Sequence, residues 1–298
     1  MFDTHCHLNF EAFAGRVEEV INEAKKVGVN QIVVPGTDFE TSKKAVEIAE
    51  KYEGIYAAVG IHPHHVYEIY KKARDRKFFD GKQQTLPAGR QAQTNLIPSL
   101  SILLASPKVV AIGEVGIDRH IYQKTKYPDY KIGEEFVKLQ KIILKEQILL
   151  SIKYDKSLVL HNREAKADML EVLNKIWDKK LEGRSVFHCC EPDPELLEFA
   201  KKHRMFIGVD GDITYKNPPA GGKQDFIKTV PLEMLVLETD SPFLMPRLLS
   251  IPRPLDRYNE PKNIQVIAEF VAKLKDISIN RLIETTTENA RRLFKVSP

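Results

Sequence analysis

Met1-Phe2-Asp3-Thr4-His5-Cys6-His7 opens the chain with a short apolar segment that leads directly into two histidines. This pattern predicts a β-strand that ends in His5 and His7. Because side chains alternate between the two faces of a strand, both imidazoles are expected on one face, about 6–7 Å apart along the backbone. Neutral imidazole is the commonest protein ligand of divalent transition metals, so the pair suggests part of a metal site. An isolated His-x-His is more often a pair of ordinary surface or core histidines, and the remaining sequence decides between the two interpretations.

Apolar runs and amphipathic segments alternate along the rest of the chain. The predicted strands are 1–7, 31–34, 55–59, 109–113, 158–160, 185–187, 205–208 and 235–237. The predicted helices are 11–27, 39–52, 134–152, 164–177, 194–202, 261–274 and 279–294. Successive βα units predict a parallel sheet with right-handed crossovers. Eight such strands are the number in a closed (β/α)8 TIM barrel, which is the fold we expect.

Polar residues of metal-binding type follow almost every predicted strand. In a TIM barrel the carboxyl ends of all strands meet at one end, and that end carries the active site. The candidates in chain order are His5, His7, His62, Glu114, His161, His188 and Asp240. Four of the histidines with the two carboxylates are sufficient for two divalent ions, with one carboxylate bridging them. Imidazole favours Zn, while the carboxylates are compatible with Mn or Mg.

Composition is typical of a globular protein and limits the choice of partners. The 298 residues are 43% hydrophobic and 29% charged, with a net charge of +4, which permits an anionic substrate without requiring one. Three cysteines argue against a disulfide framework, and no apolar run approaches the length of a membrane span, so we expect a cytoplasmic protein without a membrane association. We expect one domain over residues 1–298, with a polar loop insertion near 78–93. Nothing in the sequence implies an obligate protein partner.

Taken together, the motifs resemble the TatD family of metal-dependent deoxyribonucleases, within the amidohydrolase-like barrels. The segments that carry the resemblance span the chain and are Phe2–Leu8, 60–64, 111–118, 160–165, 187–189, 238–244, 259–261 and 287–294. The resemblance implies that His5, His7 and Asp240 hold one ion, that His161 and His188 hold the other, and that Glu114 bridges them. It also implies that Asp240 and Glu114 are catalytic, with Asp240 placed to take the proton of the attacking water.

Three further residues are candidates for contact with the substrate. Arg163 can clamp a phosphate, because a guanidinium matches phosphate oxygens bidentately, although a surface salt bridge is the alternative. His62 and His64 follow the third strand and can contact a phosphate or leaving group, with a purely structural role about as plausible.

The sequence therefore predicts an enzyme: a hydrolase that cleaves phosphodiester bonds of DNA, from an end, by a metal-activated water. The enzymatic alternative is hydrolysis of an amide, ester or lactone at the same two-metal site, since an activated hydroxide also attacks carbonyl carbon. The non-enzymatic alternative is a nucleic-acid-binding or scaffold protein. The complete set of candidate ligands disfavours it, because buried polar groups are costly to keep together without a function.

Overall fold

The computed structural model describes residues 1–72, 96–215, 220–247 and 258–297. The insertion expected near 78–93 lies outside the described residues. Among those described, no helix combines the length and the apolar character needed to cross a membrane.

Eight parallel strands form one sheet in which each strand pairs with the next along the chain. They are β1 Phe2–Asp3, β2 Gln31–Pro35, β3 Ile55–Val59, β4 Val109–Asp118, β5 Ser157–Arg163, β6 Ser185–His188, β7 Phe206–Val209 and β8 Leu235–Leu237. The last and first strands also meet, because the amide of Thr4 donates to the carbonyl of Leu237 at 3.1 Å and Cys6 forms a parallel bridge with Ser241. The predicted TIM barrel is confirmed.

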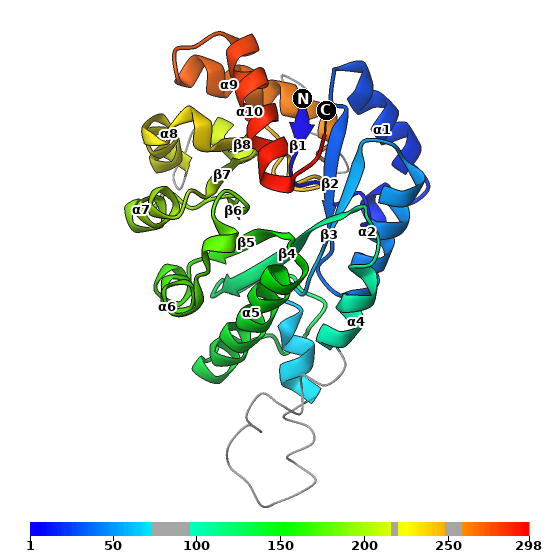
Figure 1. Cartoon of the computed structure of the whole chain (residues 1–298), viewed down its shortest axis with the longest axis vertical. Helices are drawn as coiled ribbons and strands as arrows, with labels where there is room; N and C mark the ends of the chain where they lie inside the picture. The colour runs from blue at the N-terminus through cyan, green and yellow to red at the C-terminus, as the bar shows by residue number, and fades with distance from the viewer. Residues whose placement is uncertain (73–95, 216–219, 248–257, 298) are drawn as a thin grey trace, which may run out of the picture.

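Helices surround the sheet on its outside (Figure 1). They are α1 Val17–Lys26, α2 Phe39–Lys51, α4 Leu96–Leu103, α5 Glu134–Tyr154, α6 Lys166–Ile176, α7 Pro194–Lys202, α8 Ala220–Thr229, α9 Ile264–Leu274 and α10 Ile279–Phe294, with a further helical segment at 66–72. Local signals explain several of their ends. Asp38 caps α2 through a capping box with Thr41, and Pro194 occupies the first turn of α7 after the Asp193 cap.

The end of the barrel opposite the expected site is filled with apolar side chains. One buried cluster takes residues from every strand, including Phe2, Val33 and Ala58, and joins them to Leu293 and Phe294 of α10. The rings of Phe2 and Phe294 lie 5.8 Å apart. Because α10 covers the amino ends of the strands, only the carboxyl ends remain for a site.

Three strands end several residues away from their predicted ends, and each difference affects candidate residues. The fifth strand runs to Arg163 rather than ending at Leu160, so His161 lies inside it. The first strand ends at Asp3, so His5 and His7 lie in the segment that follows it. The fourth strand does not end at Gly113 but continues to Asp118. Its register against β5 shifts between Ile112 and Val115, so that Glu114 lies inside a β-bulge rather than at a strand end. A bulge redirects side chains locally, and this one carries Glu114 towards the other candidates.

Candidate metal centre

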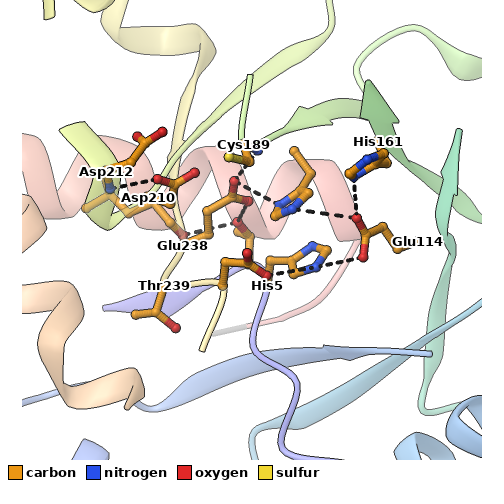
Figure 2. Close-up of polar contacts among 12 residues, drawn as sticks. His5, Glu114, His161, Cys189, Asp210, Asp212, Glu238 and Thr239 are labelled. Carbon is orange, nitrogen blue, oxygen red and sulfur yellow. Dashed lines mark hydrogen bonds and ion pairs between the residues drawn. The ribbon is translucent and has the colours of Figure 1, made fainter. Parts of the chain in front are cut away.

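Residues from five parts of the barrel converge at the carboxyl ends of the strands (Figure 2). Those predicted as metal ligands are His5 and His7 after β1, Glu114 in β4, His161 in β5, His188 at the end of β6 and Asp240 after β8. Backbone contacts fix the first and last of these segments against each other. The amide of His7 donates to the carbonyl of Ser241 at 2.7 Å, and the amide of Asp240 donates to the carbonyl of His5 at 2.9 Å.

Two of the candidate imidazoles, His5 and His7, each lie close to both candidate carboxylates, Glu114 and Asp240. His5 Nε2 lies 3.2 Å from His7 Nε2, 3.5 Å from Glu114 Oε2 and 3.8 Å from Asp240 Oδ1. His7 Nε2 lies 3.7 Å from Glu114 Oε2 and 3.4 Å from Asp240 Oδ1. Donor atoms about 2.1 Å from a tetrahedral ion stand roughly 3.4 Å from one another. The spacing and the chemistry of this first donor set, His5, His7, Glu114 and Asp240, therefore fit a divalent transition metal.

The two carboxylates of the first donor set are held in the ionised form that binds a cation. Burial alone would raise the pKa of Glu114, but the charge of His62 and hydrogen bonds from His161 and His5 lower it well below its ordinary value. Burial would likewise raise the pKa of Asp240, but its hydrogen bond with His7 and the charges of His188, His5 and His7 together outweigh burial and lower it. Both groups are available as anionic ligands at neutral pH.

The second oxygen of Glu114 faces a different group of imidazoles. Its Oε1 atom lies 3.4 Å from His62 Nε2, 3.7 Å from His188 Nε2 and 2.7 Å from His161 Nδ1. The separate directions of Oε1 and Oε2 suit the bridging role predicted for this carboxylate. His161 is also hydrogen-bonded at Nε2 to Asp118 Oδ2, at 3.2 Å. Burial would lower the pKa of His161, but these two carboxylates raise it to about 9.

The candidate substrate residues lie around this centre at different depths. His62 is buried and lies close enough to Glu114 and His161 to join the second group as a ligand, which adds to its predicted role towards the substrate. His64 instead contacts Thr125 Oγ1 through Nε2 at 2.7 Å, and burial lowers its pKa to about 4. Arg163, at the end of β5, lies over the ring of Tyr122 at 5.1 Å. The roles of these residues and of the six ligands stay predictions.

Sequence reasoning missed two buried carboxylates that support the centre. Asp3 accepts hydrogen bonds from the amides of His5 and Thr239 and from the hydroxyl of Thr239 at 2.7 Å, so it ties the segment after β1 to the segment after β8. Glu238 lies 3.0 Å from His188 Nδ1. The sequence did contain a signal for both acids, because each stands two residues before a predicted ligand. Asp3 lies in an apolar strand before His5, and Glu238 comes directly after an apolar strand and before Asp240.

A separate acidic cluster lies beside the centre in Figure 2, but it forms ion pairs with a lysine. Cys189, Asp210 and Asp212 are close enough to share an ion. The buried ammonium of Lys223 lies 2.6 Å from Asp212 and 3.3 Å from Asp210. A lysine thus neutralises this cluster, which distinguishes it from the first donor set.

Comparison with known proteins identifies the family. The family model of TatD related DNases matches residues 2–295. The chain belongs to this family. The uncharacterized metal-dependent hydrolase YabD of Bacillus subtilis strain 168 is 31% identical over the whole of both chains. The 3′-5′ ssDNA/RNA exonuclease TatD of Escherichia coli K12 is 28% identical, also over the whole of both chains.

A solved structure agrees with the family assignment. The TatD homologue YjjV of Escherichia coli K12 superimposes with a TM-score of 0.76 at 26% identity, covering 100% of this chain and 98% of that one. The predicted class of enzyme, a TatD-type metal-dependent hydrolase that acts on the phosphodiester bonds of DNA, is confirmed by the family and its relatives.

Proposed function

We propose that this protein removes nucleotides from the 3′ end of single-stranded DNA by metal-dependent hydrolysis. The observation that carries the proposal is the first donor set at the carboxyl end of the barrel, whose two imidazole nitrogens lie 3.2 Å from each other and 3.4 to 3.8 Å from the two carboxylate oxygens. The direction of cleavage is taken from relatives named as 3′-5′ exonucleases that match the chain over its whole length. A barrel mouth accommodates the end of a strand more readily than an intact duplex.

The chain offers ligands for two divalent ions. In the proposal His5, His7 and Asp240 hold one ion, His161 and His188 hold the other, and Glu114 contacts both. Bound ions of this kind supply an activated water at neutral pH and neutralise charge on the reacting phosphate. The native metal is taken to be Zn, Mn or Mg, in keeping with imidazole and carboxylate donors.

The protein's own groups orient the reactants. Asp240 is ionised, and its Oδ1 atom lies 3.4 Å from His7 Nε2, so in the proposal it accepts the proton of the attacking water and passes it on towards the leaving oxygen. Arg163 binds the substrate phosphate, and Tyr122 holds the guanidinium in place through its ring and through its hydroxyl at 3.3 Å. His62 contributes a buried imidazole between Glu114 and His161.

The test uses a single-stranded oligonucleotide labelled at its 5′ end. Purified protein with Mn²⁺, Mg²⁺ or Zn²⁺ should produce a ladder of products that shorten from the 3′ end. Glu114→Gln and Asp240→Asn preserve the shape of each side chain but remove its charge, and each should lower turnover at least a hundredfold while the unfolding temperature of the metal-free variant stays near that of the metal-free wild type. Wild-type turnover in either variant would refute the assignment.

The same assay separates the proposal from the alternative chemistry. A panel of lactones, amides and carboxylic esters is offered under the same metal conditions. Turnover of one of these together with inert DNA would favour the carbonyl hydrolase, whereas stoichiometric binding of DNA without product would favour a binding protein.

A further inference from the structure

The loop that follows β8 places an exposed aromatic ring directly beside the metal centre. Phe243 is 51% exposed, three residues after Asp240. Tyr258 is 55% exposed and adjoins Asn259, whose amide donates to the carbonyl of Pro242 at 3.0 Å. Among the described residues, the exposed large hydrophobic side chains include two aromatic ones, and these are Phe243 and Tyr258. Aromatic exposure confined to one loop at the mouth of a site indicates a surface that is covered when a ligand binds.

The ring of Phe243 is continuous with the candidate metal ligands. It lies 6.2 Å from the ring of His7 and 6.1 Å from the ring of Phe10, and Phe10 stacks on His7 at 4.3 Å. Both neighbours stand nearly perpendicular to Phe243, at 73° and 76°. Neither of these two rings therefore occupies a parallel stacking position on Phe243.

A positive charge lies further along the same loop. Arg247 is exposed, and its guanidinium lies over the ring of Tyr215 at 4.0 Å. The backbone is held at both residues, because the amide of Phe243 donates to the carbonyl of Asp240 at 2.8 Å and the amide of Arg247 donates to Thr214 Oγ1 at 2.8 Å. A backbone held at Phe243 and Arg247 loses little conformational freedom there on binding.

We propose that the segment 243–247 is a subsite for single-stranded nucleic acid, in which Phe243 stacks on the base next to the cleaved phosphate and Arg247 contacts a neighbouring phosphate. Aromatic rings combined with cations are the means by which proteins hold single strands without reading their sequence. One sugar joins a base to its phosphate, so a phosphate at the metal centre brings its base within reach of the ring beside His7. The inference rests on the proposed function and names how that site holds its substrate.

The first experiment tests whether the ring of Phe243 contacts a base of the substrate. Steady-state hydrolysis is measured for wild type, Phe243→Ala and Phe243→Trp, on an oligonucleotide with all its bases and on two others that are abasic at the last or the next-to-last position. Phe243→Ala should raise KM about tenfold on the complete oligonucleotide with kcat within twofold, and Phe243→Trp should keep the wild-type KM. On the abasic oligonucleotide that lacks the stacked base, the KM of the wild type should rise by the same factor. Phe243→Ala should not raise KM on that substrate any further.

Leu149→Ala is the matched control, because Leu149 is an exposed apolar side chain on α5. It should leave both constants unchanged. A Phe243→Ala variant that loses kcat on all substrates, or whose KM rises equally with and without the base, would show a structural role and overturn the subsite.

The second experiment tests the cation. Arg247→Ala should raise KM several-fold and reduce the slope of log affinity against log salt by about 0.7, because one phosphate contact with a single strand is lost. An unchanged slope would remove Arg247 from the subsite.

The third experiment separates this inference from the proposed function. Binding of a fluorescein-labelled oligonucleotide with hydrolysis-resistant phosphorothioate linkages is followed by anisotropy in the presence of the divalent ion. Binding about tenfold weaker for Phe243→Ala supports the subsite even if the enzyme hydrolyses no DNA. Equal binding by wild type and variant overturns the subsite even if DNA is hydrolysed.

Discussion

His188 Nδ1 lies 3.0 Å from Glu238 Oε1, while the other ring nitrogen of His188 faces Glu114 Oε1 at 3.7 Å. Both side chains are almost fully buried. Glu238 is itself held by the amide of Cys189 at 2.6 Å and by Thr4 Oγ1 at 3.3 Å. Burial would raise the pKa of Glu238, but its close contact with His188, the charge of His5 and the hydrogen bond from the amide of Cys189 together outweigh burial and lower it. A fixed carboxylate behind an imidazole sets which nitrogen is free to bind a metal.

Glu238→Gln should weaken metal binding about 10- to 100-fold, because an amide neither fixes the tautomer of His188 nor increases its basicity as a carboxylate does. The measurement is titration of the metal-free protein with Mn²⁺ or Zn²⁺ by calorimetry. Glu233→Gln is a suitable control, since Glu233 is exposed shortly before β8. Equal affinities for Glu238→Gln and wild type would exclude a role for Glu238 in orienting His188.

A second change should have the same effect without removing a polar group. A Cβ atom at Gly208 of β7 would lie 2.4 Å from Glu238 Oε1, so Gly208→Ala has to displace the carboxylate. We expect weaker metal binding for this variant in the same titration. A Gly208→Ala protein that folds with wild-type affinity would show that Glu238 can move without consequence for the centre.

Metal should stabilise the folded chain through the first donor set. An ion at a hundred times its dissociation constant contributes about 2.7 kcal/mol, which corresponds to a rise of about 5 °C in the unfolding temperature of a chain this long. EDTA should reverse the rise, and His7→Asn should remove most of it because one of four donors is lost. His203→Asn, at the end of α7, should keep the full response. A rise that survives in His7→Asn would place the ion elsewhere.

Much of the barrel could be predicted from the sequence because its signals are local. Buried strands such as Ile55–Val59 are compact apolar runs, and helices such as Pro194–Lys202 carry an N-cap, a first-turn proline and an amphipathic pattern. Strand ends then predicted which histidines meet. The two-residue separation of His5 and His7 was enough to bring their Nε2 atoms to 3.2 Å even though the strand ends before them.

Other features could not be predicted because they depend on tertiary contacts or lack a local signal. The bulge at Glu114 arises from pairing with β5, which sequence periodicity does not encode. The helix Leu96–Leu103 contains a proline and has no polar face. The helix Ala220–Thr229 has two glycines in its first turn. Neither sequence therefore shows a helical pattern. Glu238 and Asp3 were passed over because partners far along the chain, Thr4 at 3.3 Å and Thr239 at 2.7 Å, give them their roles.

Arg163→Lys tests whether the guanidinium fork matters for phosphate. Lysine keeps the charge but cannot pair bidentately with phosphate oxygens or lie flat against Tyr122 as Arg163 does at 5.1 Å. We expect KM for a single-stranded oligonucleotide to rise about tenfold, within the range for charge-assisted hydrogen bonds. Arg281→Lys, an exposed arginine on α10, should have no effect. A wild-type KM in Arg163→Lys would leave Arg163 as a structural partner of Tyr122.

Asp168 on α6 should make the stability of the barrel depend on pH. Its carboxylate lies 2.5 Å from Arg119 Nε and 2.6 Å from Lys141 Nζ, and its side chain is 12% exposed. Burial would raise the pKa of Asp168, but these two cations outweigh burial and lower it. The unfolded chain therefore binds the proton more readily, so the stabilisation is complete above about pH 4, the ordinary pKa of an aspartate, and is lost as the pH falls through the lower folded value.

Asp168→Asn should accordingly reduce the free energy of unfolding by about 1–2 kcal/mol at pH 7, measured by urea denaturation. The difference from wild type should narrow as the pH falls below about 4, because the wild-type carboxylate is then protonated in both states. Asp225→Asn is the control, since Asp225 pairs with Lys228 at 3.1 Å but is 82% exposed and should change stability by less than about 0.5 kcal/mol. A difference for Asp168→Asn that stays constant down to pH 3 would mean that its charge contributes nothing, and that packing at this position accounts for the loss.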